Sequence, residues 1–206
     1  HNILKFCKFQ LVINVAAVMV SALSPFFGIE EPLQVTHLLW INLVMDALGS
    51  LALGNEPALK EYLLEKPRKR DESLVSKEMM LQIGVMGTWL TLISFVFLTV
   101  PWFRQLFESD RAFYTGYFSL FIFAAVANGF NVRGDKWNIF EGIKENVGFL
   151  KVMGIIVIVQ IALTFLGGNL FVCTPFGLKP WIVITALAMT MIPVDMVRKL
   201  ICSHKK

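Results

Sequence analysis

The sequence predicts an all-α fold, a polytopic membrane bundle of six transmembrane helices with both termini in the cytoplasm. Of its 206 residues, 56% are hydrophobic and 17% are charged, and the mean hydropathy is +0.64. Soluble domains are about 45–50% apolar and about 25% charged. The apolar residues form six long runs, and the charged residues gather in the connections between them. These two features indicate membrane spans joined by loops.

Each apolar run is long enough to cross a bilayer, which takes about 20 mostly apolar residues. Pro25 and Gly28 close the first run, Pro101 stops the third, and Gly167-Gly168 ends the fifth. We treat the whole chain, 1–206, as one membrane domain. The predicted spans are about 4–26, 34–54, 79–100, 113–130, 149–166 and 180–200.

The charges of the connections alternate along the chain. Lys and Arg are concentrated in the second–third and fourth–fifth connections and in the C-terminal tail. The other connections are poor in them, with none between Ser24 and Thr36 and only Lys179 between the fifth and sixth spans. The positive-inside rule therefore places both termini in the cytoplasm. Three tryptophans lie at predicted interfaces, as in an aromatic belt: Trp102, Trp137 and Trp181.

Several classes of function are disfavoured. The net charge of +4 follows from topology, so we expect the lipid bilayer as a partner and no nucleic acid. Cys7 and Cys202 fall near one membrane face and Cys173 near the other, which predicts no disulfide. No Gly-rich phosphate loop, Cys/His cluster or nucleophile elbow is present, so no group here is expected to split ATP. The chain lacks an initial Met, which suggests a piece of a longer protein.

Asp46 is the most informative residue, because it lies in the middle of the second apolar run. A carboxylate at membrane depth costs roughly 2.5–3.5 kcal/mol, so it needs a partner or a purpose. No Lys or Arg lies at a matching depth. Asn42 precedes Asp46 by one turn, so the two side chains share a helix face about 6 Å apart. With Asn14 of the first span they predict a site for a hard cation such as calcium.

Other readings of the polar residues stay open. Intramembrane Asn side chains often join helices by hydrogen bonds worth roughly 0.6–2 kcal/mol, so the three predicted ligands could be structural. We expect Gly49 and Gly54 to allow close packing, Asp195 to form a surface ion pair or cap, and His37 to be a solvated interface residue. Four further polar residues are expected to be packing and interface groups: Asn128, Asn131, Gln160 and Thr164.

The chain resembles the P-type calcium-transporting ATPases, above all the plasma-membrane type. The stretch Leu39–Asp46 and the residues that follow it are similar to the sixth transmembrane helix and next loop of that family. Phe9–Val15 is similar to the fifth helix. The following segments also fit: Ser50–Leu53, Glu56-Pro57, Lys66–Arg68, Phe130–Arg133, Asn138–Gly142, Gly167-Gly168 and Ile192–Asp195.

The resemblance implies the C-terminal membrane domain, helices five to ten, of a ten-helix pump in the cell membrane. Asn14, Asn42 and Asp46 would bind the transported Ca²⁺, and the rest of the site would come from upstream helices. ATP and Mg²⁺ would act only through upstream domains, so the chain would be an enzyme only as part of its pump. Ala17 and Ala125 stand where sarcoplasmic-reticulum pumps carry second-site glutamates, which implies a single ion site. The tail shows no long basic amphipathic extension, which suggests a bacterial source.

Three alternatives follow from the same residues. The fold could carry another cation, such as sodium, potassium, a proton or manganese. It could be a non-transporting membrane scaffold in which Asn14, Asn42 and Asp46 join helices. A secondary transporter would require internal repeat symmetry, which the sequence does not have.

Overall fold

The computed structural model describes residues 2–54, 76–134, 139, 143 and 146–203, and it describes Met45 and Asp46 by their backbone only. Trp137 and the segments Glu56-Pro57, Lys66–Arg68 and Asn138–Gly142 therefore lie largely or wholly outside the described residues. The described part contains helices and no strand, and six of its helical segments are long and apolar enough to cross a membrane. Each segment begins and ends within one helical turn of the predicted span. The predicted fold class is confirmed.

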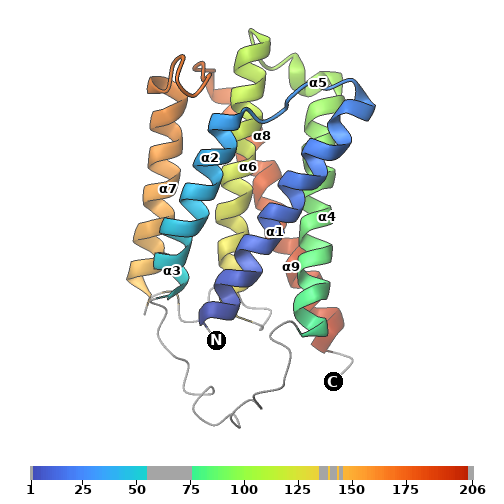
Figure 1. Ribbon diagram of the computed structural model, residues 1–206, viewed down its shortest axis with the longest axis vertical. Helices are drawn as coiled ribbons and strands as arrows, with labels where there is room; N and C mark the ends of the chain where they lie inside the picture. Colours follow the sequence, from blue (N-terminus) through green and yellow to red (C-terminus); the bar gives the residue numbers. More distant parts are fainter. Residues whose placement is uncertain (1, 55–75, 135–138, 140–142, 144–145, 204–206) are drawn as a thin grey trace.

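The spans follow one another as antiparallel rods joined at their ends (Figure 1). The second span consists of three consecutive pieces, and the last is broken once, at Thr190. The elements are α1 (Asn2–Leu23), η1 (Ser24–Phe27), α2 (Val35–Leu43), η2 (Val44–Gly49), α3 (Ser50–Gly54), α4 (Lys77–Thr99), α5 (Pro101–Arg104), α6 (Asp110–Val132), α7 (Val147–Leu166), α8 (Leu178–Met189) and α9 (Met191–Ser203).

Side-chain caps fix where three of the long helices begin. Ser76 accepts a hydrogen bond from the Met79 amide at 3.1 Å, which starts α4. Ser109 and Asn146 accept from the third residue after them at 3.2 and 2.9 Å, and so start α6 and α7. Each cap satisfies one of the amides that a helix leaves unpaired at its start, and is worth about 1 kcal/mol.

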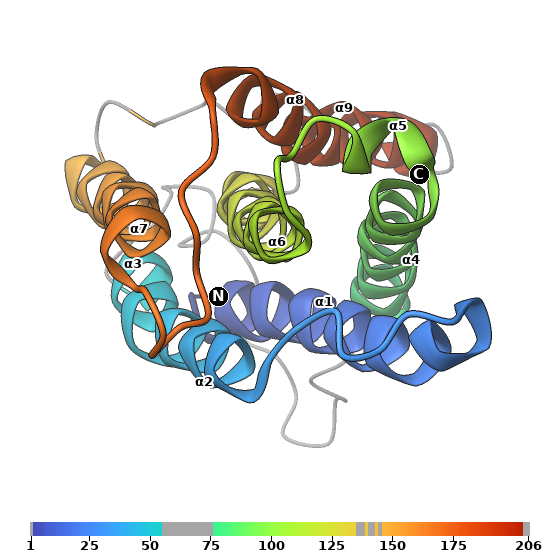
Figure 2. The same cartoon turned by 90° about the horizontal axis from the view of Figure 1, so that it is seen from above.

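Helix α6 is the centre of the bundle, with α1, α2, α4, α7 and α8 arranged around it (Figure 2). Of its most apolar stretch, 78% is buried, against 28–44% for the other five spans. It is also the least apolar of the six spans. Because α6 faces protein rather than lipid, it can hold buried Ser119, Asn128 and Asn131 without exposing them to hydrocarbon.

The two ends of the bundle differ. Helix α1 begins and α9 ends at one end, which we call the terminal face (Figure 1). The other end, the opposite face, carries η1, α5 and residues 167–177. Cys7 and Cys202 lie toward the terminal face and Cys173 lies at the opposite face, and all three are free thiols.

Candidate ion-binding site

The second span changes its helix type at the predicted ligands. Helix α2 ends at Leu43, and Val44–Gly49 continue as a π-helix that contains Asp46. Ser50 returns the chain to an α-helix, and its hydroxyl donates to the Ala47 carbonyl at 3.0 Å. Wide π-turns inside α-helices are rare and occur frequently at functional sites. The backbone around Asp46 is therefore irregular, which the sequence did not predict.

Helix α1 lies directly against this π-helix. A Cβ atom at Gly49 would stand 2.7 Å from Cε1 of Phe9, a distance that real Cβ atoms essentially never show. The close packing expected at Gly49 is present. The same expectation is wrong for Gly54, where an added Cβ would meet open space. The Gly54 carbonyl instead accepts a hydrogen bond from Nδ2 of Asn2 at 2.9 Å.

The contact between Phe9 and Gly49 sets the relative depth of the predicted ligands. Helix α1 and the second span run in opposite directions. Counted along the chain from this contact toward the opposite face, Asp46 is three residues away, Asn14 five and Asn42 seven. The three residues therefore occupy one narrow layer, shared by two helices in contact.

This layer is open on one side. Asn14 is half-buried, and Asn42 is exposed between Leu39 and Leu43, which are 64% and 56% exposed. In the part of the chain that the structure describes, no three His, Cys, Asp or Glu residues cluster to hold a metal. The described residues thus leave the side of Asn14 and Asn42 partly uncovered.

A separate group of buried polar side chains joins α6 to α7 and α9. Gln160 donates to the Ser119 hydroxyl at 3.2 Å, and that hydroxyl lies 3.3 Å from the Thr164 hydroxyl. Asn131 donates to the Met191 carbonyl at 2.9 Å. These contacts agree with the expected packing roles. Asn128 is fully buried, and neither atom of its amide has a hydrogen-bond partner among the described residues.

Asp195 is not at the surface, which corrects the expectation. Its carboxylate is fully buried and pairs with Nε of Arg198 at 2.7 Å and Nζ of Lys199 at 3.0 Å. Helix α9 packs against α4 and α6, so the face that carries these charges points inward. In the sequence, Arg198 and Lys199 follow Asp195 by three and four residues, and this spacing indicates ion pairs on one face of a helix.

His37 is also buried rather than solvated, with 1% of its surface exposed. Its ring stacks on Phe118 with the centroids 4.1 Å apart. Nδ1 accepts a hydrogen bond from the Gln34 amide at 3.3 Å, so Nε2 carries the proton and donates to the Phe171 carbonyl at 2.6 Å. His37 thereby fixes the start of the second span. Phe171 is 134 residues away in sequence, which no local pattern reveals.

Residues 167–177 cross the opposite face from α7 toward α2 and return to α8 (Figure 2). Arg111 holds this segment by donating to the Gly168 carbonyl at 2.7 Å and to Asn169 at 3.1 Å. The Thr174 amide donates to the Thr115 hydroxyl at 3.1 Å. The segment is thus attached to both α6 and the second span.

Residues 30–201 match the family model described as cation transporting ATPase, C-terminus. The chain belongs to this family. It is 30% identical over 97% of its length to calcium-transporting ATPase 10, plasma membrane-type, of Arabidopsis thaliana, and covers 19% of that protein. It is 34% identical over 87% of its length to plasma membrane calcium-transporting ATPase 2 of Oreochromis mossambicus, covering 17%.

The human plasma membrane calcium-transporting ATPase 1 is 33% identical over 88% of the chain, which covers 16% of it. This cation transporting ATPase C-terminal region thus spans a fifth or less of these relatives. Their source organisms are eukaryotic, which gives no support to the expected bacterial origin. Helix α1, with Asn14, lies before the match to the family model.

Proposed function

We propose that residues 1–206 form the membrane-embedded C-terminal domain, helices five to ten, of an ATP-driven calcium pump of the plasma membrane. Family membership and the names of the relatives support this proposal. The terminal face, which carries most of the Lys and Arg residues of the loops, would face the cytoplasm. ATP and Mg²⁺ would act through parts of the pump that precede this chain.

The transported Ca²⁺ would bind in the layer of Asn14, Asn42 and Asp46. Asp46 would supply negative charge, and the two amides would supply neutral oxygens. Calcium takes six to eight oxygen ligands in flexible geometry, so further oxygens must come from elsewhere in the pump. The uncovered face at Leu39 and Leu43 is the side from which upstream helices would complete the site.

One observation carries the proposal. The second span turns into a π-helix in the segment where the sequence places Asp46 one turn after Asn42, and α1, which carries Asn14, packs directly against that segment. Because π-turns inside α-helices are frequent at functional sites, the irregular backbone supports a ligand role over a purely structural one. We expect the wide turn to let Asp46 adjust as the ion enters and leaves.

The decisive experiment is ATP-driven uptake of radiolabelled calcium into sealed vesicles that contain the intact parent protein. We expect Asp46→Asn to lose nearly all uptake while inserting normally, because the charge of the site is removed. Asp110→Asn is the matched control, since that carboxylate is exposed and pairs with Arg104 at the start of α6. Gln160→Leu, in the packing network, should also retain uptake.

Equal uptake by the wild type and Asp46→Asn would refute the ligand role. If the wild type takes up manganese, sodium, potassium or protons but no calcium, the same fold transports a different cation. Absence of any transport that depends on ATP would favour the scaffold reading, in which the three polar residues only join helices.

A further inference from the structure

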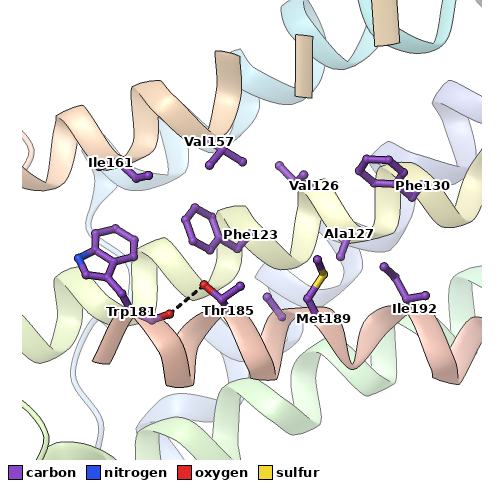
Figure 3. A pocket seen from close by; sticks show the side chains of 11 residues that line it. Phe123, Val126, Ala127, Phe130, Val157, Ile161, Trp181, Thr185, Met189 and Ile192 are labelled. Carbon is purple, nitrogen blue, oxygen red and sulfur yellow. Dashed lines mark hydrogen bonds between the residues drawn. The ribbon is translucent and has the colours of Figure 1, made fainter. Parts of the chain in front are cut away.

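A cavity of about 550 Å³ lies between α7 on one side and α8 and α9 on the other, with α6 as its floor (Figure 3). Its lining residues come from α6, α7, α8 and α9, whereas the predicted ion ligands are on α1 and the second span. Phe123, Val126 and Phe130 of α6 line the floor, and Val157 of α7 and Trp181 of α8 line the walls. We call this cavity the α7–α8 groove.

The groove is the place where the described residues leave the central helix least covered. From Ala112 to Val132 every residue of α6 is described, and only Tyr114, Phe123, Val126 and Phe130 are not fully buried. The last three line the groove at i, i+3 and i+7 spacing, which is one helix face. Apart from Tyr114, the rest of this stretch of α6 is covered by the described residues.

The walls of the groove continue into the lipid-facing surface of the bundle. Ile158 on α7 and Ile182 and Met189 on α8 are 66%, 62% and 52% exposed. Helices α7 and α8 stand apart across the groove when viewed from above (Figure 2). The groove therefore opens sideways toward hydrocarbon and not toward water.

The chemistry of the lining determines what can fill it. The Thr185 hydroxyl donates its proton to the Trp181 carbonyl at 2.8 Å, so it is not available as a donor to a molecule in the groove (Figure 3). The remaining lining side chains, the indole nitrogen of Trp181 aside, are hydrocarbon or thioether, and a buried water needs two to four polar partners. An empty groove would forfeit the dispersion contacts of its walls. The occupant must therefore be apolar.

The length of the groove suits a single lipid chain. From Trp181 to Ile192 the helix rises about 16 Å, which is about half of the roughly 30 Å hydrocarbon core. Trp181 stands at one end, and tryptophan is typical of the membrane interface. We propose that the α7–α8 groove binds one acyl chain of a membrane phospholipid and holds it longer than the surrounding lipid is held.

The test uses the intact parent protein in nanodiscs made with phosphatidylcholine that carries a photoactivatable diazirine in one acyl chain. The labelled lipid is diluted with excess unlabelled phosphatidylcholine before irradiation, and mass spectrometry locates the crosslinks. We expect crosslinks at Phe123–Phe130 and Trp181–Ile192 to survive the dilution several-fold better than those at outward-facing Ile158.

Val126→Phe would place a ring in the groove, and we expect it to remove most of the retained crosslinks. Val197→Phe makes the same change on the exposed surface of α9 and should leave them unchanged. If the yield of groove crosslinks in the wild type falls on dilution as much as the yield at Ile158, the proposal is overturned by the wild type alone. Retention unaffected by Val126→Phe would also overturn it, as would crosslinks from the groove to a protein segment in place of lipid.

Discussion

The three charged side chains Asp195, Arg198 and Lys199 stabilise one another inside the protein. Each buried charge costs several kcal/mol of desolvation, which is offset only while its partners are in place. Lys199 also donates to the Asn131 carbonyl at 2.7 Å. That carbonyl is in the last turn of α6, where carbonyls lack partners within the helix. The cluster thus holds α9 against the end of α6.

We predict that Asp195→Asn lowers the stability of the parent protein by about 3–5 kcal/mol, because it removes the buried carboxylate that pairs with both Arg198 and Lys199. The midpoint of heat-induced unfolding of the purified protein measures this loss. Asp110→Asn makes the same change in the exposed pair with Arg104 and should cost about 0–1 kcal/mol. Equal shifts in the two variants would contradict a special role for burial.

Cys173 should be protected from alkylation at neutral pH. Burial raises the pKa of its thiol to about 11, and the nearby Arg111 charge and Thr115 hydroxyl lower the pKa by less. A raised pKa keeps the thiol protonated at neutral pH, and the reactive thiolate forms only as the pH rises toward that value. The associated stability is present at neutral pH and is lost as the pH rises through about 11.

Maleimide labelling of the folded parent protein, followed by mass spectrometry, measures this protection. The half-buried Cys7 and Cys202 should label first, and Cys173 should label only after unfolding or at strongly alkaline pH. Labelling of Cys173 at the rate of Cys7 in folded protein at neutral pH would refute the prediction.

Among the elements, the second span has specific contacts with other elements on either side of the point where its helix type changes. Phe9 of α1 occupies the space beside Gly49, and His37 anchors the start of the span to Phe118 and Phe171. The π-helix thus lies between two fixed points. Local propensity does not explain its position, because contacts with α1 and α6 hold both ends.

We predict that Gly49→Ala reduces both the stability and the calcium uptake of the parent protein, because the new methyl group must displace the buried Phe9 ring. Overpacking of this kind costs about 1–3 kcal/mol. Gly54→Ala is the control, since it gains the same helix propensity of about 1 kcal/mol in open space. The midpoint of heat-induced unfolding and the uptake assay measure both variants.

The clash itself can be tested by rescue. Adding Phe9→Leu to Gly49→Ala shortens the opposing side chain and should restore part of the lost stability. If the double variant is no better than the sum of the two single changes, close approach to Phe9 is not the cause.

On the scale of the whole molecule, successive loops alternate between the two sides of the membrane because each of the six spans crosses it. The side of one loop therefore determines the side of every other loop. The spans that flank the Lys- and Arg-rich connections of the sequence have those ends at the terminal face, and the opposite face carries residues 167–177. An even number of crossings returns the chain to its starting side. One labelling experiment therefore tests the complete topology.

We predict that a membrane-impermeant maleimide added outside intact cells labels Glu30→Cys but not Ser203→Cys, each in the parent protein without its natural cysteines. Both positions are exposed, so access depends on the side of the membrane. After permeabilisation, both should label. Labelling of Ser203→Cys in intact cells would reverse the topology.

The sequence by itself determined the fold class and the six spans, and it predicts that Asn14, Asn42 and Asp46 bind an ion. These features are local, since a transmembrane span depends on about 20 successive residues and its orientation depends on the charges that flank them. The family could likewise be predicted from a short motif around Asp46, because that motif lies within a single helix.

Only the tertiary structure decided that α6 is central, that His37 and Asp195 are buried, and that the span of Asp46 contains a π-helix. Each of these depends on contacts between residues far apart in the chain, such as His37 with Phe171 and Lys199 with Asn131. Hydropathy reports how apolar a helix is and does not report whether lipid or protein surrounds it. The least apolar span is the most buried because its neighbours, and not the bilayer, cover its polar side chains.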